Sequence, residues 1–328
     1  MTARNIGIVG TGAAASAHFR VLQQVLGLTV RAACSRSPDR AREIAKSWQV
    51  DAYSSVSDMV RAGKIDITLV ATENHRHVPD ATEAVLAGSH VLIEKPIGCG
   101  PAGVAELIRL SKQFSRSVGV VLQKRFDPGL AKLKQLVRSG YFGEILHVRV
   151  DVFMHRTDAY FREKRWLFAP GSGRGALVQH FAIHYLDAVC WLFDARIKES
   201  STWSSGKARS IQAFDTAGGF FELTNGNTVT FCFSVSAPEA VRNSIDIIGT
   251  RGCVGYKAGQ LYDIAGGAPV LFPDSPGIST TETELVRLWQ HFAACATEAK
   301  LSEIDISTVL QREYDICLLY APAAISKE

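Results

Sequence analysis

Two histidines and an aspartate lie at helical spacing in an apolar stretch of the second half of the chain. His180, His184 and Asp187 stand at positions i, i+4 and i+7, which a helix would place on one face. Near neutral pH an imidazole can take a proton from an alcohol and return it, so we predict that His184 is a general acid and base. Asp187 either orients an imidazole or bonds to nearby backbone, and the spacing alone does not choose between the two.

The same histidine spacing could also ligate zinc. Metalloprotease helices carry Glu directly after the first histidine, whereas this chain has Phe181 there. The seven cysteines are scattered and include no C-x-x-C pair, which favours reduced thiols in a cytoplasmic protein over a disulfide framework or a structural zinc site. We therefore predict no metal site.

A glycine-rich turn opens the chain. The apolar run of residues 5–9 ends at Gly10, and the text G-T-G-A-A-A then leads into a helix-forming stretch. This is the G-x-G-x-x-A dinucleotide fingerprint in its strand–turn–helix setting. Gly10 permits the tight turn, Gly12 lets the backbone approach a pyrophosphate, and Ala15 lets the helix pack closely on the strand. The helix N-terminus is predicted to bind the cofactor phosphates.

The end of the second predicted strand, residues 29–34, should select the cofactor. NAD-binding domains usually place Asp or Glu there to bind the ribose hydroxyl, but this strand ends in Cys34-Ser35-Arg36 without an acid. Ser35 can donate to a 2′-phosphate, and Arg36 can pair with it. The sequence favours NADP as the cofactor and leaves NAD as the alternative.

Strand and helix patterns alternate over the first 122 residues and then change character. The alternation predicts an α/β Rossmann domain over residues 1–122, with a doubly wound parallel sheet. From residue 123 onward, period-two segments, among them a strand predicted over residues 145–153, and an Asn225-Gly226 hairpin turn predict an α+β domain over 123–328 with an open, mostly antiparallel sheet. The final helix, residues 306–324, is expected to pack at the domain boundary.

Further motifs follow the third and fourth predicted strands. The third is followed by A-T-E-N-H-R-H, which ends at His77, and the fourth ends in Glu94-Lys95-Pro96. Together with the glycine turn, and with the segments at 123–128 and 173–187, these motifs resemble the glucose–fructose oxidoreductase/inositol dehydrogenase (Gfo/Idh/MocA) family. The usual family text is A-T-P-N-x-x-H followed by E-K-P, so Glu73 stands here in place of a proline.

The resemblance implies roles for the residues at these strand ends. The ammonium of Lys95 would stabilise an alkoxide and orient the nicotinamide, and the Lys95–Pro96 bond would be cis, as is typical of the family. An imidazole from the second domain, that of His184, would act on the same C–O group. The cofactor contacts implied by the motifs are Thr72, Asn74, His77, Glu94 and Lys95.

A polar and aromatic loop, residues 155–166, precedes the histidine-bearing helix. Its hydroxyl, guanidinium and ring groups suit a sugar or polyol, on which Tyr160 or Trp166 could stack, although packing in a dimer interface is an equal alternative. The family commonly has Asp where this chain has His180, so we assign His180 to substrate contact rather than to pairing with His184. The predicted substrate residues are His180, Tyr160, Arg125, Trp166 and Asp187.

Composition limits the partners. The chain has 36 basic and 32 acidic residues, a net charge of +4, and no basic run longer than two residues, so we predict no nucleic-acid partner. No apolar stretch approaches the roughly 18 residues of a membrane span. Helices are expected to cover one face of the second sheet, and valine, phenylalanine and isoleucine on its other face suggest burial against a second subunit. We therefore predict a homodimer or homotetramer formed through that sheet.

These observations predict an NAD(P)-dependent oxidoreductase acting on a CH–OH group of a sugar, cyclitol or related polyol. Hydride transfer needs no metal, because the cofactor carries the difficult chemistry. Two alternatives share the fold. One is an NAD-dependent glycosidase that recycles its cofactor internally, and the other is a non-catalytic, nucleotide-sensing regulator.

Overall fold

The computed structural model describes residues 3–98, 101–164, 167, 176–206, 213–237, 243–266, 279–298, 300 and 302–319. The chain divides into two compact units, each described by itself below. The first unit comprises Met1–Leu122 and Glu282–Leu310, and the second comprises Gln123–Thr281 and Gln311–Glu328. The first unit therefore includes a late segment that the sequence analysis assigned to the second domain.

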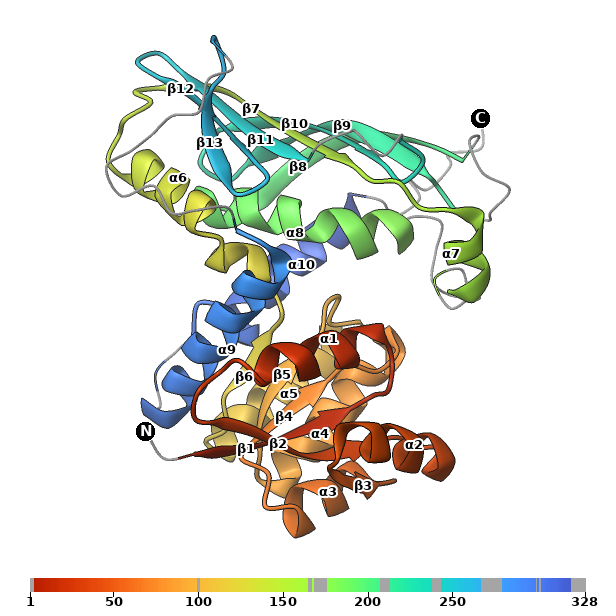
Figure 1. Ribbon diagram of the computed structural model, residues 1–328. Coiled ribbons are helices and arrows are strands. Elements are labelled where there is room, and N and C mark those ends of the chain that lie inside the picture. Colours follow the sequence, from red (N-terminus) through yellow and green to blue (C-terminus); the bar gives the residue numbers. More distant parts are fainter. Residues whose placement is uncertain are drawn as a thin grey trace. The chain divides into compact units, whose positions relative to one another are not determined.

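A six-stranded parallel sheet forms the centre of the first unit, with the strand order β3-β2-β1-β4-β5-β6 (Figure 1). This order confirms the predicted doubly wound Rossmann arrangement. Apolar residues fill both faces of its central strands, as expected for a parallel sheet covered by helices. The strands are Arg4–Val9 (β1), Leu28–Cys34 (β2), Asp51–Tyr53 (β3), Ile67–Val70 (β4), His90–Ile93 (β5) and Val118–Val120 (β6).

Helices cover this sheet, and their ends follow local sequence signals. Ser37 caps one helix by accepting a hydrogen bond from the Arg40 N–H, with Pro38 in the first turn. Another helix ends at Gly88, whose φ of 104° suits glycine. The helices of this unit are Ala13–Leu22 (α1), Pro38–Trp48 (α2), Val56–Ala62 (α3), His77–Ala87 (α4), Pro101–Gln113 (α5) and Thr281–Glu298 (α9), with a short 3₁₀ turn at Asn74–Arg76 (η1).

The late segment completes the first unit in two ways. Trp289 of α9 is fully buried, and its ring meets the His18 ring of α1 edge to face. Beyond α9, the N–H of Val120 donates to the carbonyl of Ile304 at 2.9 Å, and Gly119 and Asp305 form an antiparallel bridge. These contacts extend the β6 edge of the sheet with chain from residues 304 and 305.

A seven-stranded sheet forms the second unit, with the order β13-β12-β11-β7-β10-β9-β8. The β7–β10 pair is parallel and the other pairs are antiparallel, so the predicted mostly antiparallel sheet is confirmed. The Asn225-Gly226 turn joins β9 to β10, with Gly226 at a φ of 87°. The strands are Ile145–Phe153 (β7), Ile197–Ser205 (β8), Thr216–Leu223 (β9), Thr228–Ser234 (β10), Ser244–Gly249 (β11), Cys253–Lys257 (β12) and Gln260–Asp263 (β13).

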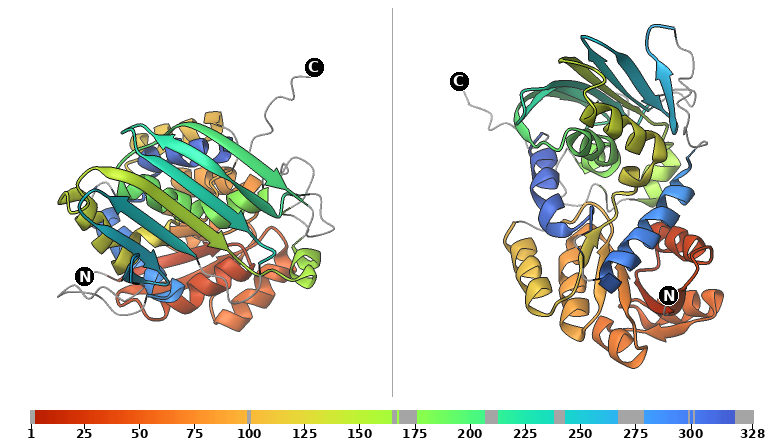
Figure 2. Two further views of the ribbon diagram at one scale, coloured as in Figure 1. Left: turned by 90° about the horizontal axis from the view of Figure 1, so that it is seen from above. Right: turned by 90° about the vertical axis from the view of Figure 1, so that its left-hand side faces the viewer.

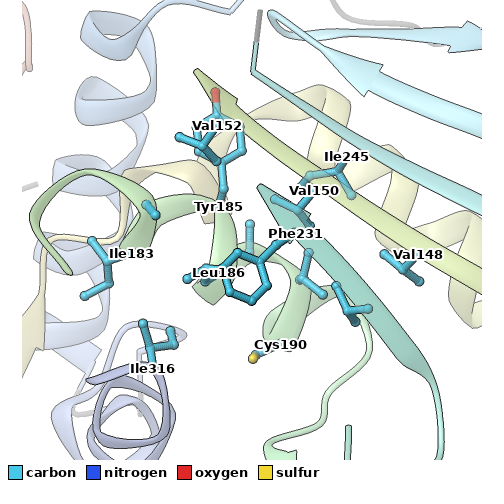
Figure 3. Packing of buried hydrophobic residues seen from close by; sticks show 14 of the residues in the cluster. Val148, Val150, Val152, Ile183, Tyr185, Leu186, Cys190, Phe231, Ile245 and Ile316 are labelled. Atoms are coloured by element: carbon cyan, nitrogen blue, oxygen red, sulfur yellow. The ribbon is translucent and has the colours of Figure 1, made fainter. Parts of the chain in front are cut away.

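Helix α8 packs on the inner face of the second sheet and contributes many of the buried side chains of the core there (Figure 3). Its Leu186 and Cys190 lie among the inward side chains of β7, such as Val148 and Val150, and near Phe231 of β10. Because one face of α8 is buried against the sheet, the side chains on its other face are held in fixed positions. The helices of this unit are Pro128–Arg138 (α6), Asp158–Glu163 (α7) and Ala176–Leu192 (α8), with a 3₁₀ turn at Gln123–Phe126 (η2). Helix α10, Ile306–Leu318, begins in the first unit and ends in the second.

The outer face of the second sheet is the face that is turned away from α8 (Figure 2, left). The valines and phenylalanines of β7 and β10 alternate inward and are buried. The outward positions are mixed: Arg149 and Asp151 form an ion pair, whereas Trp203 and Phe220 are exposed. The valines and phenylalanines of β7 and β10 thus belong to the inner core, and the burial of the outer face against a second subunit stays a prediction.

His90, at the start of β5, makes the stability of the first unit pH-dependent. Burial, with the nearby Arg116 and Arg4 guanidinium groups, lowers the pKa of His90 from 6.5 to about 4. Its Nδ1 accepts a hydrogen bond from the Ser117 N–H at 3.0 Å, a bond that protonation of Nδ1 would break. Between these two pKa values the unfolded chain binds the proton more readily. The contribution of neutral His90 to the free energy of unfolding is therefore fully present above pH 6.5 and is lost as the pH falls toward 4.

We expect the free energy of unfolding to fall by on the order of 2 kcal/mol across that window, after allowance for partial exposure. Urea unfolding at a series of pH values measures it. In a His90→Asn variant the side-chain oxygen can still accept from Ser117 but does not titrate, so the decline should be smaller. An equal decline in both proteins would contradict this assignment.

Candidate active site

The carboxyl edge of the parallel sheet gathers the sequence motifs of the first unit. The motifs follow β2, β1, β4 and β5, which are consecutive neighbours in the sheet. Backbone hydrogen bonds join the strand ends: Gly10 N–H donates to Cys34 O, Ala71 N–H to Val9 O, and Glu94 N–H to Val70 O. In doubly wound sheets a ligand binds at this edge where the strand order reverses, here between β1 and β4.

The glycine turn fits a pyrophosphate. Gly10 has a φ of 117°, and a Cβ there would collide with the carbonyl of Ala71. A Cβ at Gly12 would meet nothing within 4 Å, so the space beside this backbone is open to a ligand. No side chain caps the N-terminus of α1, and its first turn has no acidic residue, so its N–H groups suit an anion. Ala15 is fully buried where α1 packs on the sheet, as predicted.

An ion pair occupies the end of β2. The Arg36 Nη2 lies 3.3 Å from the Glu73 Oε2, and the two side chains are 61% and 49% exposed. Ser35 Oγ accepts a hydrogen bond from the Ser37 N–H. In the sequence, Glu73 stood out only as the residue that replaces the family proline. The structure shows that it brings an acid back to the position beside Arg36 where β2 itself has none.

The segment after β4 packs against the segment after β5. The Thr72 hydroxyl donates to the Asp80 carboxylate at 2.9 Å. Gly98, with a φ of 70°, approaches the backbone of Asn74 so closely that a Cβ would collide with the Asn74 carbonyl. His77 is buried, with Nδ1 2.7 Å from Pro96 O and Nε2 3.0 Å from Thr72 O. Burial lowers the pKa of His77, although both carbonyl contacts oppose that change.

Lys95 lies between these anchored groups. Its side chain is half-buried, and its peptide bond to Pro96 is cis, as the resemblance implied. The Lys95 N–H donates to the Glu94 Oε2 at 3.1 Å. The residue thus follows β5 at the carboxyl edge of the sheet, with fixed backbone on either side.

Two residues near this edge were missed by the sequence analysis. The His18 Nε2 lies 3.0 Å from the Glu94 Oε1, and the Trp289 indole N–H donates to the His18 Nδ1 at 2.8 Å. The only local signal for His18 is its place three residues after Ala15. Its partners are Glu94, which directly follows β5, and Trp289 of α9, both far away in the sequence.

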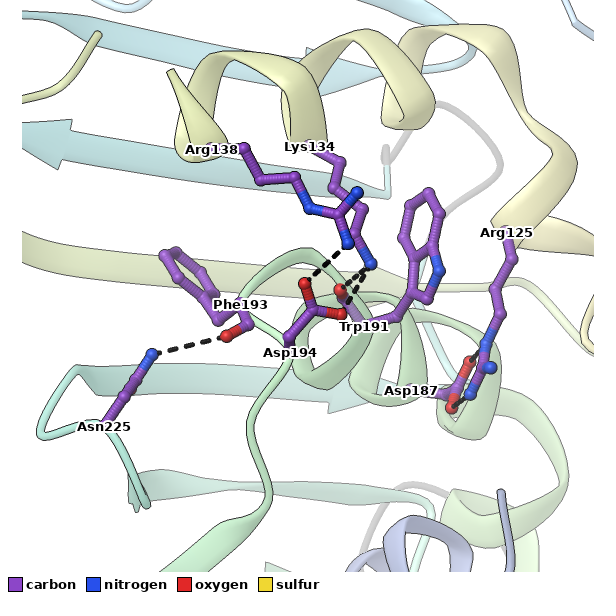
Figure 4. Close-up of polar contacts among 8 residues, drawn as sticks. All are labelled: Arg125, Lys134, Arg138, Asp187, Trp191, Phe193, Asp194 and Asn225. Atoms are coloured by element: carbon purple, nitrogen blue, oxygen red, sulfur yellow. Dashed lines mark hydrogen bonds and ion pairs between the residues drawn. The ribbon is translucent and has the colours of Figure 1, made fainter. Parts of the chain in front are cut away.

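In the second unit, α8 presents His180 and His184, both half-buried, one turn apart. Asp187 does neither of the things considered for it. It accepts two hydrogen bonds from Arg125, one from Nε to Oδ2 at 2.8 Å and one from Nη2 to Oδ1 at 2.5 Å (Figure 4). Arg125 and Asp187 are 3% and 2% exposed. This buried pair joins η2 to α8 one turn from His184.

The C-terminal end of α8 is held by cations from α6 (Figure 4). Lys134 Nζ donates to the carbonyl of Trp191 at 2.6 Å and to Asp194 Oδ1 at 2.8 Å, while Arg138 donates to Asp194 Oδ2 at 2.9 Å. Burial acts to raise the pKa of Asp194, but these hydrogen bonds outweigh it, and the pKa is lowered. Cations at a helix C-terminus are favourable, so the helix that bears His184 is anchored at two points.

The predicted substrate loop is described in part. Tyr160, at the end of the first turn of α7, is half-buried, and the Arg156 guanidinium lies 5.4 Å from its ring centroid. Burial raises the pKa of Tyr160 in spite of this cation. Trp166 and the Gly173–Gly175 part of the family-like segment lie outside the described residues. Lys95 and His184 belong to different units, so their predicted approach to one C–O group stays a prediction.

Two features are absent from the described residues, a membrane-spanning helix and a metal-binding cluster. In that part of the chain no helix is both long and apolar enough to cross a membrane. Nor does any group of three or more His, Cys, Asp or Glu side chains among those residues have a geometry that could hold a metal ion. The predicted cytoplasmic location stays a prediction.

The chain belongs to the Gfo/Idh/MocA oxidoreductases. Residues 4–122 match the family described as "Oxidoreductase family, NAD-binding Rossmann fold", and residues 130–254 match the "GFO/IDH/MocA C-terminal domain". Both halves of the predicted resemblance are thereby confirmed. The protein is an enzyme, an oxidoreductase with an NAD-binding domain.

Several of its relatives are named as dehydrogenases. An inositol 2-dehydrogenase of Corynebacterium glutamicum is 26% identical over 270 residues, which cover 78% of this chain and 74% of that protein. A D-xylose dehydrogenase of Paenarthrobacter nicotinovorans is 30% identical over 220 residues, covering 63% and 56%. The crystal structure of scyllo-inositol dehydrogenase from Lactobacillus casei, with bound NAD(H) and scyllo-inositol, covers 97% of this chain and 95% of its own, with a TM-score of 0.81 and 20% identity. That last likeness concerns the fold.

Proposed function

We propose that this enzyme transfers a hydride between a nicotinamide cofactor and a secondary alcohol or ketone of a sugar, cyclitol or related polyol. The observation that carries the proposal is the carboxyl edge of the first sheet, where the open glycine turn, the Thr72–His77 segment and Lys95 follow neighbouring strands. The activities of the inositol and xylose dehydrogenases named above support the substrate class.

The residues of each unit have distinct tasks in this proposal. When bound, the nicotinamide supplies the hydride donor or acceptor. The Gly10–Gly12 turn holds the pyrophosphate, and Thr72, Asn74 and Glu94 line the same edge of the sheet. Because both ring nitrogens of His77 face backbone carbonyls, its task is to hold two loops together rather than to touch the cofactor.

Lys95 and His184 are the proposed catalytic residues. The Lys95 ammonium stabilises negative charge on the reacting oxygen, and His184 takes the hydroxyl proton or returns it. His180 and Tyr160 contact the hydroxyl groups of the substrate. Arg125 and Asp187, which the sequence analysis placed in contact with substrate, instead hold the helix that carries both histidines.

An absorbance assay tests the proposal. Purified protein is mixed with NADP or NAD and a panel of cyclitols, aldoses and sugar nucleotides, and reduced nicotinamide is followed by its near-ultraviolet absorbance. Turnover with at least one polyol is expected. Cleavage of a glycoside without net reduced cofactor would instead indicate the recycling glycosidase, and tight cofactor binding without any turnover would indicate the regulator.

The cofactor preference in this proposal is for NADP, through Arg36. An Arg36→Ala variant should raise KM for NADPH by about 10-fold or more, as the loss of a hydrogen bond to a charged group would. The KM for NADH should change by less than about 2-fold, since NADH lacks the 2′-phosphate. Steady-state kinetics with both cofactors measures this, and equal changes would defeat the assignment.

A Glu73→Gln variant provides the matched comparison. The Glu73 carboxylate pairs with Arg36 and repels a phosphate, so its neutral isostere should lower KM for NADPH by about 2- to 5-fold, the range of an exposed ion pair. In the Arg36→Ala background the same change should have a smaller effect.

We also propose a homodimer or homotetramer formed through the outer face of the second sheet, supported by the exposed Trp203 and Phe220. The sedimentation mass of the protein tests the assembly.

A further inference from the structure

We propose that His18 is a positioning residue for Lys95, acting through Glu94, and that Trp289 fixes the tautomer in which it does so. The inference rests on the proposed function, because it concerns the lysine assigned there to catalysis. His18 of α1 and Trp289 of α9 have no task in the proposed function, and His18 meets Glu94, the residue that directly follows β5. All three belong to the first unit.

The tautomer follows from the donors available. The Trp289 indole N–H can only donate, so the His18 Nδ1 that it meets at 2.8 Å must accept. The proton of the neutral ring is therefore on Nε2, which donates to the Glu94 Oε1 at 3.0 Å. The His18 residue is 1% exposed and Trp289 is 0% exposed, so water does not compete for either bond.

Glu94 is thereby held at both carboxylate oxygens. Oε1 accepts from His18, and Oε2 accepts from the N–H of the next residue, Lys95, at 3.1 Å. The Glu94 N–H is itself fixed on the carbonyl of Val70 in the neighbouring strand. The carboxylate thus ties the peptide group that begins Lys95 to the interior of the unit.

The other side of Lys95 is anchored independently. The carbonyl of Pro96 meets the His77 Nδ1 at 2.7 Å. Because its backbone is fixed before and after the Cα, the Lys95 side chain departs from one position in one direction. Without His18, the Glu94 Oε1 loses this buried donor, and the hold on the carboxylate that accepts from the Lys95 N–H is weakened. A displacement of about 1 Å in a catalytic group can cost on the order of 100-fold in rate.

Three variants separate positioning from mere packing. His18→Leu removes both hydrogen bonds at similar volume, and we expect kcat to fall by about 10- to 100-fold. His18→Gln can donate through its amide nitrogen to Glu94 and accept from Trp289 through its oxygen, so kcat should recover to within about 3-fold of wild type. Trp289→Phe frees the tautomer and should give an intermediate loss of about 3- to 10-fold. In all three the Kd for the cofactor should stay within about 2-fold.

His90→Leu is the control. It also removes a histidine hydrogen bond, that to the Ser117 N–H, from the opposite end of the same strand β5. We expect it to lower the melting temperature and to leave kcat within about 2-fold of wild type. A kcat loss in His90→Leu equal to that in His18→Leu would overturn the proposal, because general destabilisation would then explain both.

A second measurement does not depend on turnover. The rate at which Lys95 is methylated by formaldehyde and borohydride is followed by mass spectrometry of its peptide. It should change by more than about 3-fold in His18→Leu and remain at the wild-type value in His18→Gln and His90→Leu. Wild-type values of both kcat and labelling in His18→Leu would overturn the proposal. If His18→Leu does not fold, wild-type values of both in Trp289→Phe would do so.

The two proposals fail in different ways. If the wild-type protein turns over no polyol, the proposed function fails, while the Lys95 labelling rates still decide whether His18 positions the lysine. If the wild-type enzyme is active and the labelling rates are all equal, the proposed function stands and the positioning role falls.

Discussion

A Lys95→Ala enzyme is expected to bind cofactor normally and to lose kcat by about 100-fold or more. The ammonium is the group that Lys95 contributes to charge stabilisation, and the removal of one such preorganised group typically costs 100- to 1,000-fold. The surrounding segment does not depend on the side chain, since Glu94 and Pro96 are bonded through other atoms. Steady-state turnover and cofactor titration of the variant measure the two quantities separately.

Two further lysine variants make this prediction specific. Lys95→Arg keeps the charge but places it differently, so only partial activity should remain. Lys112→Ala, in an exposed position on α5, should leave kcat unchanged. Unimpaired turnover in Lys95→Ala would remove the lysine from the mechanism.

Removal of one partner of the Arg125–Asp187 pair should cost about 3 to 5 kcal/mol of unfolding free energy, because it leaves a buried charge without its partner. Asp187→Asn is the conservative variant, and urea unfolding measures the loss. His184 lies one turn away on the same helix, so kcat should fall as well. Replacement of both residues by leucine should recover much of the stability, since a buried ion pair is often no better than apolar packing.

Arg138 on α6 provides the matched comparison. It also pairs with an aspartate near α8, but the Arg138 and Asp194 side chains are 65% and 50% exposed. Arg138→Ala should therefore cost less than about 1 kcal/mol. Similar losses for the buried and the exposed pair would contradict the structural role given to Arg125 and Asp187.

The sequence predicted those elements whose burial leaves a local pattern. The strand over Ile145–Phe153 was predicted to the residue, because its apolar positions alternate over nine residues. Strand β8 was missed because nearly all its side chains are at least partly exposed, so its sequence I-K-E-S-S-T-W-S-S carries no such alternation. The three-residue strands β3 and β6 were missed because they are too short to show any period.

The residues of the candidate site also fall into those that a local pattern predicted and those that it could not. Motifs of fixed local spacing placed Gly10, Arg36 and Lys95 at the ends of the correct strands. Pairings between distant segments could not be read from spacing. Arg125 and Asp187 were each singled out, yet their mutual bond joins residues 62 positions apart. The indole that bonds to His18 lies 271 positions away, on a helix that the sequence analysis placed in the other domain.

The late return of the chain to the first unit has a consequence for biosynthesis. When the first 122 residues leave the ribosome, the indole that meets His18 and the carbonyl that meets Val120 have not yet been translated. The nascent nucleotide-binding layer therefore has an open strand edge and an incompletely bonded histidine until about residue 304 has emerged. Maturation of the lysine loop is in this way tied to translation of Trp289 and Ile304, which follow long after the loop itself.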